Sequence, residues 1–439
     1  MTINKINGEL CKKARSLWEE VFSEDSVQFT DYYFENKAEK NIGYVIGQAP
    51  FDAMMFRTPY QLQIGQARKE ISYIVGVATR KECRHKGYMR ALLNYAIREM
   101  YQEKNPFTFL MPANPAIYEP FDFEYVYERD VWEVKEPERM VPFLEELTSG
   151  IKITENEKII STESIVRKRK LELGNKNEKD EIVRKRELEL RNKNEKDDYE
   201  LTEAEAELCN CAEGKSLWES EQAKSESGLK KLTGLYSVRN LRRQFPKFPI
   251  MNLLAEFAND YLREHYNIYV YREASYYEMQ LKESEAQNGD IYVLFDTGMM
   301  KAFFVYAKEG EEIFIQEVLE AEEGVLDFLQ KSEKKKPIIM ARIIHLEEML
   351  KLVCSRENIS TTIEIKDELI PENAGVYQWE ITPQGSKVQK VLQAANWLDT
   401  KNTETKNTET DKSRLAEVSM QIRELAVKIL SRVFINEIV

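Results

Sequence analysis

Hydrophobic residues in the first third of the chain follow the order strand, turn, helix, strand. Residues 71–79 are apolar and β-branched without helical spacing, which predicts a strand buried on both faces. A basic stretch at 84–90 follows, and apolar residues then recur at helical intervals over 91–97. A second strand is predicted at 107–111. We therefore expect a central strand to lead through a turn at Gly87 into a helix.

Beyond this stretch, the same patterns predict helices and strands along most of the chain. Helical spacing predicts two helical segments within 10–37 and further helices at 250–261, 321–329 and 413–431. Strands are predicted at 43–47, 54–56, 124–127, 131–134, 268–271, 291–296, 301–307, 312–318, 361–365 and 375–381. Helices and strands mixed in this way predict an α/β or α+β fold class.

Two segments of low complexity interrupt the pattern. Residues 165–181 are almost repeated at 182–198, with dense mixed charge and few apolar side chains, so we expect a solvated helix or a disordered insertion over about 164–198. A Lys-Asn-Thr-Glu-Thr repeat at 401–410 predicts a surface loop over about 400–412.

Length and composition narrow the class of protein. A chain of 439 residues, 42% hydrophobic and 32% charged, predicts two or three soluble domains. The net charge of −13 disfavours nucleic acid as a partner, and it favours cationic small molecules or serves only solubility. Neither a membrane-spanning run nor an apolar signal core is found, so we expect no membrane partner and a cytoplasmic location.

Cysteine and histidine contribute little candidate chemistry. The five cysteines are odd in number and scattered, which argues against a disulfide framework, and the Cys209–Cys211 pair lacks the spacing of a zinc knuckle. The three histidines, His85, His265 and His345, have no neighbours that suggest a triad or a metal site. We therefore expect no metal and no nucleophilic catalysis of the Ser-His type.

The turn at Gly87 carries the strongest candidate for ligand binding. Backbone N–H groups in the first turn of a helix have no partner inside the helix and carry the positive end of its dipole, so they can hold a phosphate. The neighbouring Arg84 and Lys86 add positive charge. The alternative is a solvated basic corner without a ligand, because one glycine among basic residues is weak evidence alone.

Two motifs carry a family resemblance. The order Val77-Ala78-Thr79, Arg84, Gly87 resembles the acetyl-CoA-binding segment of the GNAT superfamily of acyltransferases. Met89 replaces the last small residue of that pattern, which is similar to the large bacterial acetyltransferases of the Eis-like group (enhanced intracellular survival). The stretch Ile-Tyr-x-x-Phe-x-Phe at 117–123 resembles the active-site segment of the same group.

The resemblance implies a domain organisation, with an α/β fold of two tandem GNAT-type mixed sheets and a smaller C-terminal domain. A catalytic GNAT domain is expected at 1–137, and a degenerate second one that binds no CoA at 138–335. A sterol-carrier-like α/β domain is expected at 336–439. Similar proteins assemble as hexamers, so a homo-oligomer is also expected.

The resemblance further assigns residues to acetyl-CoA, the expected co-substrate. Amides of Val75 and Val77 would line the pantetheine arm, with the Val77 N–H near the thioester oxygen. Amides from His85 to Arg90 would hold the pyrophosphate. Ala113 and Asn114 would touch the pantetheine arm, although turn chemistry accounts for them equally well. The full expected set is Val75, Gly76, Val77, Arg84, His85, Lys86, Gly87, Tyr88, Met89, Arg90, Ala113 and Asn114.

Two catalytic groups are implied in the same way. Tyr118 would be the general acid toward the leaving thiolate, and the carboxylate of Val439 the general base toward the amine. The alternative for Tyr118 is a core aromatic packed with Phe121 and Phe123. The resemblance also implies that Asp25 receives a substrate ammonium; the alternative is a helix cap at Asp25 or Ser26.

These expectations predict an acetyl-CoA-dependent N-acetyltransferase. Its acceptor would be a primary amine on a cationic small molecule, of the aminoglycoside or polyamine type, or on a lysine side chain. A binding protein that carries a lipid or acyl chain on the C-terminal domain is the alternative, as is an assembly protein without activity.

Overall fold

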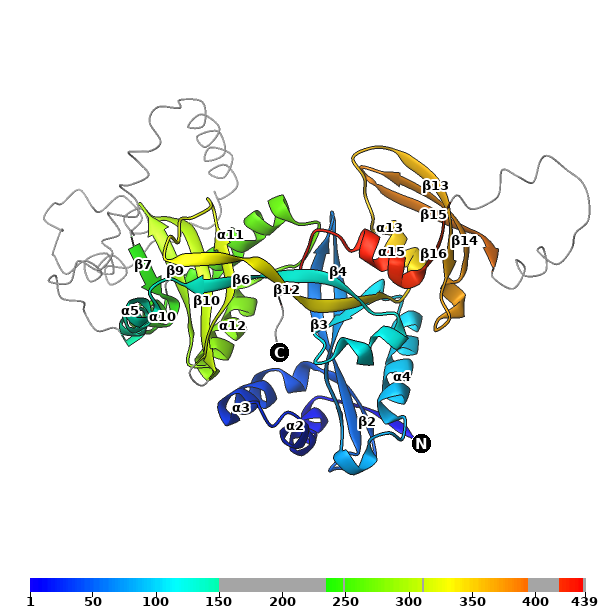
Figure 1. Ribbon diagram of the computed structural model, residues 1–439, viewed down its shortest axis with the longest axis horizontal. Helices are drawn as coiled ribbons and strands as arrows, with labels where there is room; N and C mark the ends of the chain where they lie inside the picture. Colours follow the sequence, from blue (N-terminus) through cyan, green and yellow to red (C-terminus); the bar gives the residue numbers. More distant parts are fainter. Residues whose placement is uncertain (150–233, 248, 310–311, 394–417, 437–439) are drawn as a thin grey trace, which may run out of the picture. The chain divides into compact units, whose positions relative to one another are not determined.

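The computed structural model describes residues 1–149, 234–247, 249–309, 312–393 and 418–436 (Figure 1). The chain divides into two compact units. Unit 1 comprises Met1–Asp130, Leu262–Arg272 and Lys334–Val439, and unit 2 comprises Val131–Tyr261 and Glu273–Glu333. The predicted mixed α/β fold class is confirmed, with sheets and flanking helices in both units.

A nine-stranded mixed sheet forms the centre of unit 1. Its main path runs in the order β1, β2, β3, β4, β5, β12, β6, while β8 pairs with the end of β3 and β17 pairs with β8. The strands are β1 (Ile3–Asn7), β2 (Ile42–Ile46), β3 (Ala53–Ile64), β4 (Ala67–Thr79), β5 (Phe107–Leu110), β6 (Glu124–Val134), β8 (Ile268–Val270), β12 (Leu329–Ile343) and β17 (Val433–Phe434).

Helices cover both faces of this sheet. Those of unit 1's first part are α1 (Glu9–Lys12), α2 (Arg15–Val21), α3 (Val27–Asn36) and α4 (Tyr88–Gln102). Apolar spacing gives α4 a buried face that packs with Met55 of β3, whereas the next residue, Phe56, lies near Trp18 of α2. Successive residues of a strand point to opposite faces, so α4 and α2 lie on opposite sides of the sheet.

A smaller sheet completes unit 1. It has the order β15 (Gly385–Gln393), β14 (Gly375–Thr382), β13 (Ile359–Lys366) and β16 (Val418–Gln421), accompanied by α13 (Leu346–Lys351) and α15 (Ile422–Ile429). Three neighbouring strands pair antiparallel, and β16 joins β13 in parallel. This part of the chain was expected to be sterol-carrier-like, and that assignment stays a prediction.

Unit 2 contains a four-stranded antiparallel sheet in the order β11 (Glu312–Glu320), β10 (Met299–Glu309), β9 (Asp290–Asp296) and β7 (Gly234–Ser237). Its helices include α5 (Pro137–Ser149), α10 (Val238–Gln244) and α12 (Ala274–Ala286), while α11 (Ile250–His265) continues from unit 2 into unit 1. The turn predicted at Asp296-Thr297-Gly298 is confirmed, with positive φ at Thr297 and Gly298.

Several predicted elements are wrong. No helix forms at 321–329, because the Glu320 carboxylate accepts the backbone N–H groups of Gly324 and Leu326 at 3.0 and 2.7 Å and closes a turn. Within 413–431, the described residues begin with strand β16, held by its pairing with β13, and the helix is confined to α15. Three short helices occupy 9–36, where two segments were expected.

The expected domain boundaries stay a prediction, and one strand bears on them. β12 lies between β5 and β6 in the first sheet, with Met340 opposite Leu110. The first sheet thus takes a strand from beyond the expected 1–137 domain. The charged repeat at 164–198, the Cys209–Cys211 pair, the loop at 400–412 and Val439 lie outside the described residues.

A bulge in β4 breaks the regular register of the central sheet. Met54 pairs with Ala78 and Phe56 with Val75, so two β4 residues, Gly76 and Val77, face one residue of β3. Gly76 has φ +62, and a Cβ built there would lie 2.7 Å from Cζ3 of Trp18. Glycine is therefore required here by both the backbone conformation and the closeness of the indole.

We expect Gly76→Ala to destabilise the protein by about 2–4 kcal/mol, since it adds a strained φ and an overpacked contact with Trp18. Gly324→Ala is the matched control: it has φ +74 but no atom within 4 Å of the added Cβ. The control should cost only about 1–2 kcal/mol. Urea unfolding of both variants measures the difference, and equal losses would contradict the role assigned to the Trp18 contact.

Candidate active site

The central feature of the site is a fork between two parallel strands. β4 and β5 pair in parallel from Ser72↔Thr108 to Ile74↔Leu110, where β5 ends. β4 continues to Thr79 and pairs on its other side with β3. Amides of successive residues in a strand point to opposite sides, so some N–H groups of 75–79 face the side that β5 has left. The expected pantetheine contacts, Val75 and Val77, lie in this stretch.

The second feature is the start of α4. Gly87 is its N-cap in the left-handed conformation, and the Ala91 N–H donates to the Gly87 carbonyl at 3.0 Å as the first bond of the helix. The amides of Tyr88, Met89 and Arg90 precede that bond, so they have no acceptor within the helix. A Cβ added at Gly87 would meet no atom within 4 Å. Open space therefore lies beside Gly87 at the helix start, and a phosphate fits the donor set.

Basic side chains around this turn have distinct contacts. Arg84 Nε donates to the Thr79 carbonyl at 3.3 Å, which ties the turn to the end of β4. Lys86 Nζ lies 3.9 Å from Sγ of Cys83. His85 is exposed with φ 61, and Arg90 places its guanidinium 5.2 Å from the centre of the Phe121 ring. Arg90 thus connects the helix start with the segment that carries Tyr118.

Tyr118 lies between two short 3₁₀ helices, Pro115–Ile117 and Glu119–Phe121. Its ring is 7% exposed and packs edge-on against Phe123, with centroids 6.0 Å apart. Burial raises the pKa of Tyr118 to about 12, so the phenol stays protonated at neutral pH. The ring therefore packs in the core, as the alternative interpretation of Tyr118 predicted. A protonated hydroxyl is also the state that a general acid needs.

One core cluster brings several expected site residues together. It contains Tyr118 and Ile74, and the partly buried Val77, Tyr88 and Met89 pack against it. The larger Met89 thus contributes to the core beneath the helix start. Tyr118 consequently shares a single packed cluster with the fork and with the first turn of α4.

Other candidates have local structural roles. The Asn114 side chain caps the first 3₁₀ helix by accepting the Ala116 N–H at 3.1 Å, and Ala113 beside it is exposed. Ser26 caps α3 by accepting the Phe29 N–H at 3.1 Å. Asp25 instead accepts the indole N–H of Trp18 at 2.8 Å. Turn and capping chemistry therefore account for Asn114 and Ser26.

The last described residues belong to the first sheet. β17 pairs in parallel with β8, and Phe434 lies 5.6 Å from the ring of Tyr127 in β6, centroid to centroid. Ile435 and Asn436 are buried. The end of the described chain is thereby fixed in unit 1, the unit that contains the fork.

Sequence reasoning missed one buried charge beside this site. Arg342 of β12 is fully buried, and its Nη2 lies 2.8 Å from Asp367 and 3.8 Å from Asp122, which follows the Tyr118 segment. Leu369 and Ile370 pack in the same core cluster as Tyr118. The sequence did contain a signal for this buried charge: Arg342 is the one charged residue in the otherwise apolar stretch 338–344.

Two findings concern other kinds of site. Across the described ranges, no group of three or more His, Cys, Asp or Glu side chains is arranged to hold a metal ion. In the same residues, no helix is both long enough and apolar enough to cross a membrane.

One family model matches the part of the chain that contains this geometry. Residues 2–126 match the family model described as an acetyltransferase (GNAT) domain. The comparison with curated proteins finds no significant match. The matched range contains the fork, the helix start and Tyr118.

Solved structures resemble the whole chain in fold. A probable N-acyltransferase from Enterococcus faecalis is 13% identical with a TM-score of 0.57, covering 97% of this chain and 88% of its own. A GCN5-related N-acetyltransferase from Anabaena variabilis is 13% identical with a TM-score of 0.56 (97% and 89% covered). Eis1 from Mycobacterium abscessus is 9% identical with a TM-score of 0.52 (98% and 90%). The chain therefore carries a GNAT acetyltransferase domain in residues 2–126, within a fold that it shares along its length with these proteins.

Proposed function

We propose that this protein transfers an acetyl group from acetyl-CoA to a primary amine. The observation that carries the proposal is a pair of amide sets within a GNAT domain: one on β4 beyond the last pair of the β4–β5 ladder, and one in the first turn of α4. The helix-start amides would hold the pyrophosphate, and the amides of β4 would hold the pantetheine arm. The acetyl thioester would then lie beside the fork, near Val77.

The chemical step follows from these positions. The neutral amine attacks the thioester carbonyl carbon, and the charge that develops on oxygen is stabilised by the Val77 N–H. The C–S bond then breaks, and Tyr118 gives its proton to the departing thiolate. The carboxylate of Val439 takes the proton from the amine nitrogen. Pairing of β17 in the first sheet and burial of Ile435 support this role for the chain end.

The acceptor belongs to the same proposal. A net charge of −13 favours approach by a cationic amine, such as an aminoglycoside, a polyamine or a lysine side chain. Eis1 of Mycobacterium abscessus shares the fold. The hexameric assembly, the sterol-carrier-like C-terminal domain and the cytoplasmic location stay predictions.

Gly87→Glu tests the phosphate site. The new side chain enters the open space before the helix, where its negative charge opposes a phosphate. Because no atom lies within 4 Å of the added Cβ, the fold should survive. Calorimetry should show that acetyl-CoA binding is lost while the melting temperature falls only by a few degrees. Micromolar affinity in the folded variant would contradict this assignment.

Tyr118→Phe tests the general acid. The variant keeps the packed ring but removes the proton donor, so kcat should fall by roughly 100-fold. Because the pKa of Tyr118 is about 12, its protonated form persists below that value, and the wild type should show no loss of kcat between pH 7 and 10 from this group. Tyr125→Phe, on the same core cluster, is the control that should retain kcat. A fall in the kcat of the wild type near pH 9 that is absent in Tyr118→Phe would contradict the raised pKa of Tyr118.

A C-terminal extension tests the proposed base. Adding two residues after Val439 replaces its carboxylate with a neutral peptide group, so turnover should fall by about 100-fold while acetyl-CoA binding persists. Val439→Ala is the matched control, because it keeps the terminal carboxylate and should have a mild effect. Rates from thiol release with a panel of amines give the comparison. Full activity in the extended protein would eliminate this mechanism.

A further inference from the structure

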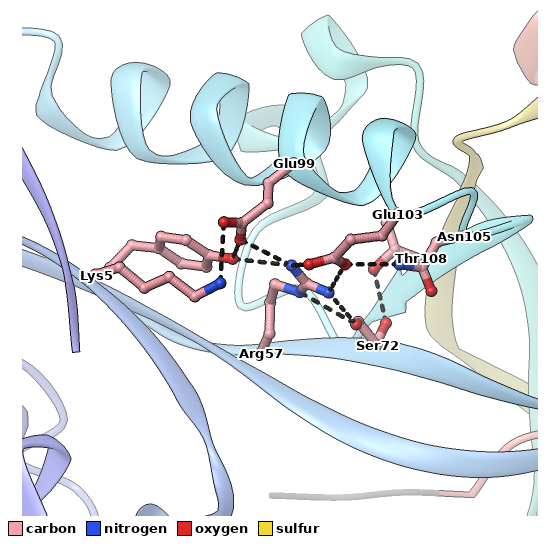
Figure 2. Close-up of polar contacts among 8 residues, drawn as sticks. Lys5, Arg57, Ser72, Glu99, Glu103, Asn105 and Thr108 are labelled. Atoms are coloured by element: carbon pink, nitrogen blue, oxygen red, sulfur yellow. Dashed lines mark hydrogen bonds and ion pairs between the residues drawn. The ribbon is translucent and has the colours of Figure 1, made fainter. Parts of the chain in front are cut away.

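An ionic network centred on a buried arginine lies at the base of the fork, on the α4 side of the first sheet (Figure 2). Its centre is Arg57 of β3, which is 4% exposed. The guanidinium contacts two carboxylates of α4: Nη2 donates to Glu103 Oε2 at 2.6 Å and Nη1 to Glu99 Oε2 at 3.2 Å. The same guanidinium donates to Ser72 Oγ of β4 at 3.0 and 3.1 Å.

The network joins five strands of the first sheet, β1 to β5, to helix α4. Tyr44 of β2 accepts from Arg57 at 2.8 Å and donates to Glu99, while Lys5 of β1 donates to Glu99 at 2.9 Å. Thr108 of β5 donates to the Ser72 carbonyl at 2.7 Å. Figure 2 shows Arg57 between the helix above it and the strands below it. Arg57 therefore connects α4 to β4, and through Ser72 to β5.

The C-terminal end of α4 carries negative charge that Arg57 neutralises. Two glutamates lie in the last turn and at the C-cap of the helix, where the dipole disfavours negative charge. Lys5 and Arg57 balance them, and Lys5 is 40% exposed, so Arg57 is the buried counter-ion. Burial alone would lower the pKa of Arg57, but the hydrogen bond to Glu103 and its other partners raise it above the ordinary value. The guanidinium thus stays charged.

The position of this network relates it to ligand binding. Ser72 and Thr108 form the first pair of the parallel ladder, and the fork opens after Ile74. The helix held at its far end by Arg57 begins after Gly87, where its first amides are proposed to hold the pyrophosphate. Acetyl-CoA would contact both the helix start and the opened strand, so its binding depends on the placement of one relative to the other.

We infer that Arg57 is a positioning residue for acetyl-CoA, which it never touches: it fixes α4 against β4 and β5, and so sets the spacing between the two amide sets. This inference rests on the proposed function. A purely stabilising role makes a different prediction, because loss of stability alone leaves the affinity of the folded protein unchanged.

The test measures acetyl-CoA affinity by calorimetry and melting temperature for the full chain. Arg57→Met removes the charge and every donor, and it should weaken binding about 10-fold in the folded protein. Arg57→Lys keeps the positive charge but lacks the several N–H donors of the guanidinium, so it should give a smaller loss of affinity. Glu103→Gln keeps a hydrogen-bond acceptor and should lie near Arg57→Lys. If Arg57→Met fails to fold, the acetyl-CoA affinities of Arg57→Lys and Glu103→Gln provide the test.

Tyr292→Phe is the matched control for stability. Its buried hydroxyl bonds to the Leu144 carbonyl at 3.1 Å in unit 2, so the variant loses stability at a site unrelated to the fork. Its affinity should equal that of the wild type. Unchanged affinity in the Arg57 variants, or an equal loss in Tyr292→Phe, would overturn the inference. A wild-type protein that binds no acetyl-CoA would instead overturn the proposed function.

Discussion

A backbone N–H without a partner inside its own sheet or helix needs another acceptor. Unit 1 has two groups of amides in this position. One arises where β5 ends at Leu110 while β4 continues to Thr79. The other arises at the start of α4, where every helix leaves its first amides without internal partners. Both groups lie in the range matched by the GNAT family model. The proposed chemistry depends on these backbone donors first and on side chains second.

Packing holds the two amide groups in place. Trp18 lies against Gly76 at the bulge, Arg90 lies over the Phe121 ring, and the Tyr118 cluster joins the fork to the helix start. Buried charges add fixed geometry. Asp367 accepts Arg342 at 2.8 Å and the Ile370 N–H at 2.9 Å, which anchors residues after β12 beside the Tyr118 cluster. Replacing a buried ion pair with well-packed apolar residues is often neutral for stability, so this pair is weak evidence for net stabilisation.

Local patterns made strands such as β4, β5, β9 and β10, as well as α4 and the Gly87 turn, predictable, since apolar periodicity and a glycine among basic residues act over a few neighbouring positions. Long-range packing made the rest unpredictable. Placement of β12 between β5 and β6 joins residues more than 200 positions apart, and the bulge at Gly76 depends on the distant Trp18. The failed helix at 321–329 has a local cause in Glu320, whose carboxylate satisfies the turn amides. Asp25 was weighed as an ammonium ligand or a cap; Ser26 caps α3, Asp25 accepts the Trp18 indole N–H, and the ammonium role stays a prediction.

Amide hydrogen exchange tests the central claim most directly, because the claim concerns backbone N–H groups. With saturating acetyl-CoA, exchange should slow in peptides covering 75–79 and 85–91, where the two amide groups lie. Exchange in β9, β10 and β11 of unit 2 should remain unchanged. Unchanged exchange at both amide groups, or protection confined to unit 2, would contradict the account.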